Sequence, residues 1–383
     1  MTAVRTGPAV AAGEGTRLVQ RVFVIRELGI AVALALLVVT TVLVNPRFLT
    51  AQGVKDLLLG STVLAVLAVG QSIVVITRNV DLSVGSVLGL SAFATGSLFV
   101  ANPGLPIPVA LVLGVLLGAA CGVVNGALIA AARVPALVVT LGTLYVFRGL
   151  DHTWAAGRQI NAADMPPGFL RLGSATVLGV PVLALFAVVV LVAAGYYLRS
   201  YRGGRELYAI GSSPAAARLV GIPVGRRVFA AFVVSGALAG LAGVLYAARF
   251  GTLDANAGNG LELNVVAAVV VGGVAIFGGS GSVYGAALGA VLLTTIGSAL
   301  PVLGVSPFWQ RAAVGALILA AIGLDRALAV RLARTLRHQN TRGHAARGPD
   351  PDGQGACGQN ARGPDADDQG ADDQDIRGRS GRG

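Results

Sequence analysis

Residues 57–76 read LLLGSTVLAVLAVGQSIVVI, a run of twenty residues that contains no charged side chain. At about 1.5 Å of rise per residue, a helix of this length spans the roughly 30 Å of hydrocarbon in a bilayer. A helix on the surface of a soluble domain would instead carry a stripe of charged and polar side chains. The stretch therefore predicts a transmembrane α-helix.

The composition of the whole chain extends this interpretation. Of the 383 residues, 55% are hydrophobic and 12% are charged, against roughly 45–50% and 25% in soluble domains. We therefore expect an all-α, polytopic membrane protein. The net charge of +11 does not indicate nucleic-acid binding, because the basic residues are scattered between apolar runs and near the two termini.

Similar apolar windows recur along the chain and predict about ten transmembrane helices. They cover residues 29–44, 57–76, 82–100, 107–131, 135–150, 179–198, 229–248, 263–279, 283–301 and 309–325. The fifth window follows Pro135 and runs into Arg148, and the eighth opens with Glu262 and Asn264. Eight or nine full crossings with re-entrant pieces fit this pattern as well. Glycines within 272–281 favour close helix packing or a turn in a broken helix.

The distribution of arginine predicts the orientation of these spans. Short loops rich in arginine stay cytoplasmic, and Arg78, Arg133 and the arginine cluster of residues 199–228 fall in every second segment between the spans. An even number of spans then places both termini in the cytoplasm. We expect a multi-pass protein of the plasma membrane, with a cytoplasmic N-terminal segment over 1–28 and a transmembrane domain over 29–326. The polar tail, 338–383, has hardly an aliphatic side chain and predicts cytoplasmic disorder.

Several catalytic functions are excluded by residues that the sequence lacks. The phosphate-binding loop G-x-x-x-x-G-K-[S/T] requires a lysine after glycine, whereas the one lysine of the chain, Lys55, follows Val54. The three histidines have no second ligand at a spacing suited to a metal, and no serine occupies a nucleophile elbow. We expect a non-catalytic subunit that binds no cofactor and no metal. If transport consumes ATP, a partner chain must hydrolyse it.

The long polar interruption at 199–228 contains the signals of one short helix. Ser213 is suited to the N-cap, Pro214 to the first helical position and Gly221 to the left-handed position after the end. Two turns of helix are unstable alone in water, so this helix needs a partner surface, and docking into a groove of another protein is one mode. A helix lying in the lipid interface and an ordinary structured loop are the alternatives. The residues of this candidate docking helix are Ser213, Pro214, Ala215, Ala216, Ala217, Arg218, Leu219 and Gly221.

This helix and three further stretches resemble one family of transport proteins. The stretches are TRNVDLSVGS at 77–86, VPALVVTLGT at 134–143 followed by FRG at 147–149, and AAVVVGGVAIFGGSG at 267–281. In this order they resemble the permease subunits of ATP-binding-cassette importers of the ribose type, which include rhamnose and autoinducer-2 permeases in the branched-chain/ribose permease superfamily. The resemblance covers residues from about 27 to 325.

The resemblance implies a function and a set of partners. It implies a permease that translocates a monosaccharide of the rhamnose or ribose kind, or autoinducer-2. Such a permease pairs with itself or a sister permease, docks cytoplasmic ATPase subunits through Ser213–Gly221 as a coupling helix, and receives solute from an extracytoplasmic binding protein. The alternative is an ion-coupled secondary transporter of a small solute, which would need membrane-embedded acids or an internal repeat. A scaffold or channel is a third class.

Three residues are candidates for the translocation path or its gate. Asp81 lies at the inner edge of a span, where its carboxylate can pair with Arg78, cap the helix that enters at Ser83, or line the path. Asn125 can form a hydrogen bond between helices or contact a sugar. Trp154 can lie at the outer mouth or serve as an interfacial anchor.

Overall fold

The computed structural model describes residues 12–306, 308–317, 319–320 and 323, and helices dominate that part of the chain. Six of its helices are long and apolar enough to cross a membrane: α2 (Ala51–Ile76), α3 (Val84–Ala101), α4 (Ile107–Ala130), α7 (Val182–Ser200), α10 (Val224–Phe250) and α12 (Val283–Val302). Two more long helices are α1 (Ala12–Val44) and α5 (Ala136–Ala155). The prediction of an all-α membrane protein is confirmed.

Short elements connect these helices. They are the 3-10 helices η1 (Pro46–Leu49) and η2 (Ala162–Asp164), the helices α6 (Pro167–Ser174), α8 (Arg202–Ser212), α9 (Pro214–Leu219) and α11 (Leu261–Val271), and the strands β1 (Thr176–Val177) and β2 (Val180–Pro181). The two strands pair antiparallel, with Thr176 opposite Pro181. Leu178 and Gly179 form their turn with positive φ angles of 53° and 82°, as a tight hairpin requires.

The predicted windows and the observed helices coincide in most of the described chain. The fifth window corresponds to α5, one continuous helix of 20 residues that begins directly after Pro135. The tenth window is helical over 309–317, and its end lies outside the described residues, as does the tail predicted at 338–383. The helix of the first window already begins at Ala12. The total of ten crossings and the side on which the termini lie remain predictions.

The eighth window is a broken helix. α11 has eleven residues, which at about 1.5 Å each cover about half of a hydrocarbon layer. A loop, 272–282, follows and turns back on left-handed glycines, among them Gly278 at φ 74° and Gly279 at φ 78°. Gly279 N donates to the carbonyl of Ile76 at 2.9 Å, so the loop packs on the end of α2. Gly278 and Gly279 therefore serve the turn, whereas Gly272 lies close against the backbone of α12 at Gly285, so both expected roles occur.

α10 is the central helix, and it contacts α2, α3 and α4. Its closest neighbour is α4, where glycines of the two helices face each other. A Cβ atom on Gly118 would overlap the carbonyl oxygen of Gly236, and one on Gly240 would overlap that of Gly114. Small residues at spacings of four thus let the two backbones approach closely, as in many membrane helix pairs.

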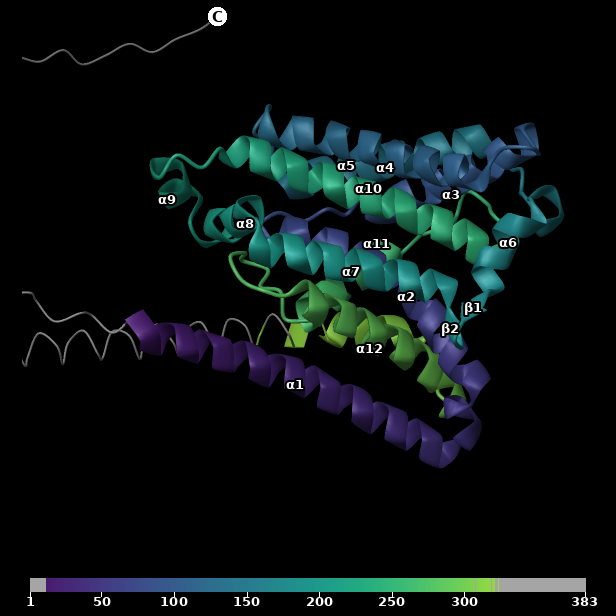
Figure 1. Ribbon diagram of the computed structural model, residues 1–383, viewed down its shortest axis with the longest axis horizontal. Coiled ribbons are helices and arrows are strands. Elements are labelled where there is room, and N and C mark those ends of the chain that lie inside the picture. The colour runs from purple at the N-terminus through teal and green to yellow at the C-terminus, as the bar shows by residue number, and fades with distance from the viewer. Residues whose placement is uncertain (1–11, 307, 318, 321–322, 324–383) are drawn as a thin grey trace, which may run out of the picture. The chain divides into compact units, whose positions relative to one another are not determined.

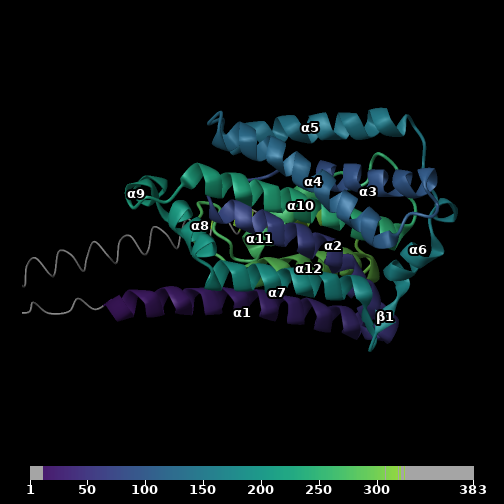
Figure 2. The same cartoon turned by 45° about the horizontal axis from the view of Figure 1, so that its top comes forward.

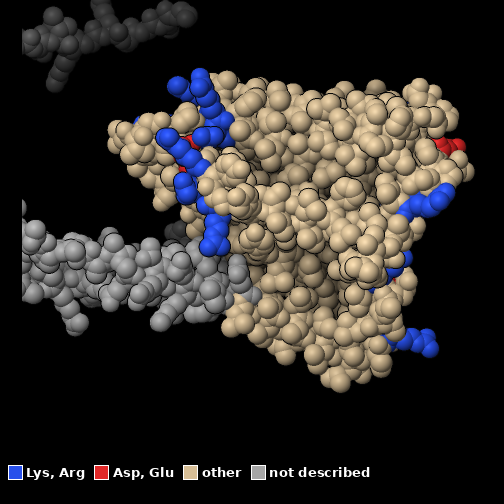
Figure 3. All heavy atoms as spheres, in the orientation of Figure 1, with Lys and Arg blue, Asp and Glu red and all other residues tan. Residues whose placement is uncertain are grey.

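The outer helices expose apolar side chains. Only 28% of the apolar window of α4 and 22% of that of α7 are buried, whereas α2 buries 83%. Figures 1 and 2 show α2, α10 and α11 between α1 on one side and α4 and α5 on the other. On the face drawn in Figure 3, Lys and Arg gather at the two ends of the helices and leave a broad uncharged band between them. This band suits lipid contact or contact with another apolar subunit.

Candidate functional site

α9 is the short helix that the sequence predicts, and its ends are capped as expected. The Ser213 hydroxyl accepts a hydrogen bond from Ala216 N at 3.3 Å, and Pro214 occupies the first turn. At the other end Gly221 has φ 79°, Gly221 N donates to Arg218 O, and Ile222 N donates to Ala217 O, each at 3.0 Å. These two bonds form a Schellman motif, which ends the helix sharply.

The residues of α9 divide into an inner and an outer face. Ala217 is buried, with 3% of its surface exposed, and α9 contacts α8 and α10. On the outer face Leu219 is 89% exposed, and Val220, directly after the helix, is 75% exposed. Figure 1 places α9 at the end of the helices, projecting beyond them. The exposed residues of the predicted docking set are Ala215, Ala216, Arg218, Leu219 and Gly221.

α8 is tied to α10 by a buried carboxylate. Glu206 accepts from Arg227 Nε at 2.6 Å and from Arg202 Nε at 2.8 Å, and its side chain is 8% exposed. Burial acts to raise the pKa of the Glu206 carboxyl, but the hydrogen bonds from the two arginines outweigh it and hold the pKa below its usual value. α9 is therefore held between two helices that are clamped to each other.

Arg78 also reaches α8, and it does not pair with Asp81. Its Nε donates to the carbonyl of Gly211, and its Nη2 donates to the carbonyl of Ser212 at 2.6 Å. These carbonyls lie at the C-terminal end of α8, where unpaired acceptors and the helix dipole attract a cation. The pair with Asp81, one of the alternatives that the sequence offered, is thus wrong, because the Asp81 carboxylate is directed to Ser83 and Ser235 instead. The bonds join the α2–α3 connection to α8.

Asp81 is buried in a break between α2 and α3, with 1% of its surface exposed. Its Oδ1 accepts from the Ser83 amide at 3.0 Å and the Ser83 hydroxyl at 2.7 Å, and its Oδ2 accepts from the Ser235 hydroxyl at 3.3 Å. The Asn125 amide donates to the Ser83 hydroxyl at 2.8 Å. We call Asp81, Ser83, Asn125 and Ser235 the Asp81 cluster. It joins α3, α4 and α10 at a non-helical segment.

The cluster agrees with two of the structural alternatives that the sequence offered. Asp81 bonds to the N-cap residue of α3, and Asn125 makes a hydrogen bond between helices. In the described part of the chain no basic side chain pairs with the Asp81 carboxylate, which depends on hydroxyl and amide donors. A buried polar group held in this way is suited to fix the arrangement of the three helices that it joins.

Trp154 does not belong to this cluster. Its ring packs edge-on against Phe93, with 5.9 Å between centroids, and 43% of its surface is exposed. On the same helix, Thr140 donates to the carbonyl of Val80, beside Asp81, at 3.3 Å. Trp154 lies about 21 Å further along α5 at about 1.5 Å per residue. It is therefore near the helix ends opposite α9, which suits either the mouth or the anchor.

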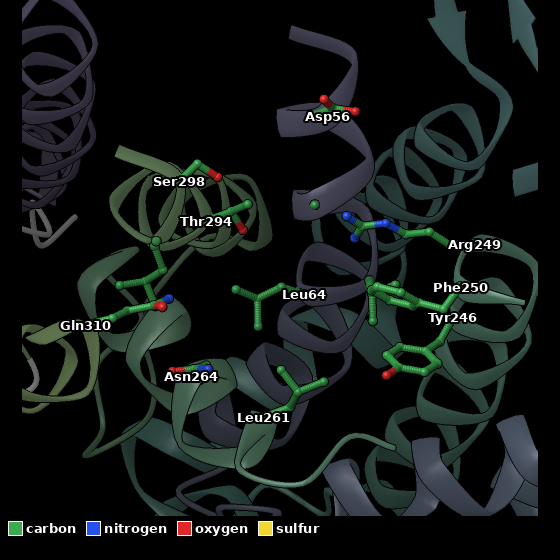
Figure 4. A pocket seen from close by; sticks show the side chains of 14 residues that line it. Asp56, Leu64, Tyr246, Arg249, Phe250, Leu261, Asn264, Thr294, Ser298 and Gln310 are labelled. Atoms are coloured by element: carbon green, nitrogen blue, oxygen red, sulfur yellow. The ribbon is translucent and has the colours of Figure 1, made fainter. Parts of the chain in front are cut away.

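A cavity that the sequence did not indicate lies at that same end. Its volume is about 580 Å³, and α2, α10, α11, α12 and the segment that holds Gln310 surround it. In Figure 4, Thr294, Ser298, Asn264 and Gln310 lie on one side and Arg249, Phe250 and Tyr246 on the other, with Leu64 between them. These residues come from distant parts of the sequence. In the sequence, the only sign of this cavity was that its polar residues lie inside or beside apolar windows.

Arg249 is held firmly at the wall of this cavity. Its Nη1 donates to the carbonyl of Leu59 at 2.8 Å, and its guanidinium lies over the Phe250 ring, 4.7 Å from the centroid. The cation–π contact and the hydrogen bond together fix the direction of the side chain. Asp56, the one acid among the residues that line the cavity, accepts from Gln52 Nε2 at 2.9 Å.

Comparison with known proteins points to transport. Residues 53–322 match the family described as "Branched-chain amino acid transport system / permease component". The chain is 36% identical over 312 residues to the autoinducer 2 import system permease protein LsrC of Enterobacter sp. (strain 638), covering 82% of this chain and 90% of the relative. It is 35% identical over 314 residues to the protein of that name in Escherichia coli (strain K12 / DH10B), covering 82% and 91%. No solved structure matches the chain.

Proposed function

Because the chain belongs to the family of branched-chain amino acid transport system permease components, we propose that it is the membrane subunit of an ATP-binding-cassette importer for autoinducer 2 or a similarly small monosaccharide. The solute class is taken from the relatives, which are import system permeases for autoinducer 2. In this proposal the chain lies in the plasma membrane, binds no cofactor and leaves ATP hydrolysis to a partner.

The observation that carries the proposal is the outer face of α9. Leu219 and Val220 are exposed at the end of a helix that is too short to be stable without support. The clamp through Glu206 and the inward Ala217 hold the helix in place and leave this apolar tip free. In an importer, this apolar tip would bind in a groove of the cytoplasmic ATPase subunit.

A route for coupling leads from α9 to the Asp81 cluster. α9 follows α8 directly, and Arg78 binds the last carbonyls of α8. Arg78 and Asp81 lie on the same short connection between α2 and α3. When nucleotide moves the ATPase, a shift of α8 and α9 would pull on this connection, and the cluster is where we expect the path to open or close.

The remaining partners complete the transport cycle. The exposed apolar faces of α4 and α7 leave area for a second permease, either a copy of this chain or a sister subunit. An extracytoplasmic binding protein delivers the solute at the end opposite α9.

The test is association with an ATP-binding-cassette ATPase subunit that is co-expressed with this chain. Leu219→Glu places a carboxylate in the apolar contact, and we expect recovery of the ATPase with the purified permease to fall at least about tenfold, because burying that charge costs a few kcal/mol. Leu178→Glu is the matched control, since Leu178 is 100% exposed in the hairpin turn, outside the proposed docking surface. Ala217 is a poor probe, because a charge there would disturb the packing of α9.

Uptake in cells separates this proposal from an ion-coupled transporter. ATP depletion should abolish uptake of labelled autoinducer 2 while an ionophore that collapses the proton gradient, applied with ATP maintained, leaves it unchanged. Uptake that survives ATP depletion, or equal ATPase recovery with Leu219→Glu and Leu178→Glu, contradicts the proposed function.

A further inference from the structure

The cavity of Figure 4 has the properties of a ligand site, and we propose that it binds a neutral, hydroxylated molecule of monosaccharide size. The proposed ligand site depends on the proposed function only for the assignment of this end of the helices to the side from which solute enters. Its volume of about 580 Å³ is within the roughly 300–1,000 Å³ of small-molecule sites. It opens at the helix ends opposite α9, where an importer receives its solute.

Four uncharged polar side chains of the cavity make no hydrogen bond to the described part of the chain, in contrast to Arg249 and Asp56. Buried hydroxyls in these helices bond back to a carbonyl one turn earlier, as Thr295 does to Val291 at 2.8 Å. Thr294, the neighbouring residue, lines the cavity and makes no such bond among the described residues, nor do Asn264, Ser298 and Gln310 bond to another described group. Two amides and two hydroxyls are therefore available to a ligand as both donors and acceptors.

Two glycines bring these side chains to the cavity. A Cβ atom on Gly60 of α2 would lie 2.8 Å from Thr294 Cγ2, and one on Gly297 of α12 would lie 2.5 Å from Gln310 Nε2. Any larger residue would push Thr294 or Gln310 away. The missing side chains at Gly60 and Gly297 thus leave room for Thr294 and Gln310, at positions where a larger side chain would ordinarily fill the contact between helices.

The charges and rings select the class of ligand. The cavity wall holds one cation, Arg249, and one anion, Asp56, so it does not favour a ligand of either sign. The rings of Tyr246 and Phe250 pack with 4.4 Å between centroids and provide an apolar wall, with Leu64 between them and the polar side. A sugar or polyol presents hydroxyl groups at its edge and C–H groups on its face, which fits a site that is polar on one side and apolar on the other.

Thiol labelling of the purified full chain tests the site without the ATPase. Thr294→Cys should react with a water-soluble methanethiosulfonate, and autoinducer 2 or D-ribose at millimolar concentration should slow the reaction at least threefold. Thr295→Cys is the matched control, because position 295 is 2% exposed and does not line the cavity. Cys357→Ser removes the background thiol of the polar tail, and Cys121 is buried.

Uptake supplies the second readout. Thr294→Val and Asn264→Leu each remove hydrogen bonds without a large change of volume, and we expect each to raise the half-saturating solute concentration roughly tenfold. Thr295→Val should leave that concentration as in the parent chain, and ATPase recovery should be equal in all three variants.

The outcomes of the two experiments distinguish a failure of the proposed ligand site from a failure of the proposed transport function. If neither solute protects the thiol of the Thr294→Cys variant, or if uptake by Thr294→Val equals that of Thr295→Val, the site is overturned. Protection of that thiol without ATP-dependent uptake leaves the site intact and overturns the proposed function.

Discussion

Asp81 shows how a single buried carboxylate can organise a helix junction. Its oxygens accept from Ser83 and Ser235, and Asn125 reaches the same Ser83 hydroxyl. Asp81 accepts directly from the start of α3 and from α10, and it is linked to α4 through the Ser83 hydroxyl, so loss of the acceptor weakens the whole junction. A carboxylate so deep in an apolar bundle is costly and is retained where it fixes a geometry or takes part in function.

Substitution of Asp81 separates its hydrogen bonds from its charge. Asp81→Ala leaves buried donors unsatisfied and should lower the free energy of unfolding by about 1–3 kcal/mol. Asp81→Asn retains an acceptor for Ser83 and should keep the unfolding temperature of the detergent-solubilised protein near that of the parent chain. If Asp81→Asn destabilises as strongly as Asp81→Ala, the charge of Asp81, rather than its acceptor role, holds the cluster.

At the scale of the element, the α8–α9 unit depends on the clamp at Glu206. The two arginines contribute unequally, because the side chain of Arg202 is 85% exposed and that of Arg227 is 33% exposed. Ion pairs in water contribute little, whereas partly buried ones contribute more. Arg227 belongs to α10 and links it to α8, whereas Arg202 lies on α8 together with Glu206.

The pH dependence of the clamp follows from the lowered pKa of Glu206. A carboxyl whose pKa is lower in the folded state stabilises the fold above its unfolded pKa, and that contribution is lost as pH falls through the folded pKa. We expect Glu206→Gln to speed hydrogen exchange of the α8 and α9 amides at pH 7. The parent chain should approach the rate of Glu206→Gln as the pH falls below the ordinary glutamate range, after correction for intrinsic exchange. Arg227→Gln should act more strongly than Arg202→Gln, and equal effects would contradict the clamp.

The close contact between α4 and α10 depends on the glycines at their interface. Gly118→Leu forces a side chain into the backbone of Gly236 and should lower stability by about 1–3 kcal/mol or more. Gly142→Leu on α5 is the matched control, because a Cβ there meets no atom within 4 Å. Thermal unfolding in detergent should show a lower midpoint for Gly118→Leu alone. A similar loss in both variants would point to helix propensity or lipid contact instead.

At the scale of the described bundle, the two ends of the helices differ in chemistry. One end holds α9, the Glu206 clamp and Arg78, and the other holds the cavity with its amides and hydroxyls. Between the two ends the surface drawn in Figure 3 is uncharged, and the Asp81 cluster is buried in the interior among α3, α4 and α10. Under the proposed function, the cavity would receive the solute, the Asp81 cluster would lie on the path and α9 would dock the cytoplasmic partner.

Local sequence signals were sufficient for much of this description. Membrane residence follows from runs of twenty apolar residues, and the caps of α9 follow from Ser213, Pro214 and Gly221, because both depend on the chemistry of a few neighbouring residues. The resemblance to sugar permeases likewise came from short ordered motifs. The bond between Asn125 and a second helix was foreseen as one of two options, since a buried amide needs a partner.

Other features depended on segments that meet only after folding. Arg78 binds carbonyls more than 130 residues away, and neither its own neighbourhood nor that of Asp81 shows that α8 supplies them. The inward direction of Ala217 depends on where α8 and α10 lie. The cavity gathers single polar residues from several helices, and none of them, Asn264 included, was predicted to line a cavity. Residues that are distant along the chain meet there only after folding, whereas helix propensity and hydropathy act along the chain.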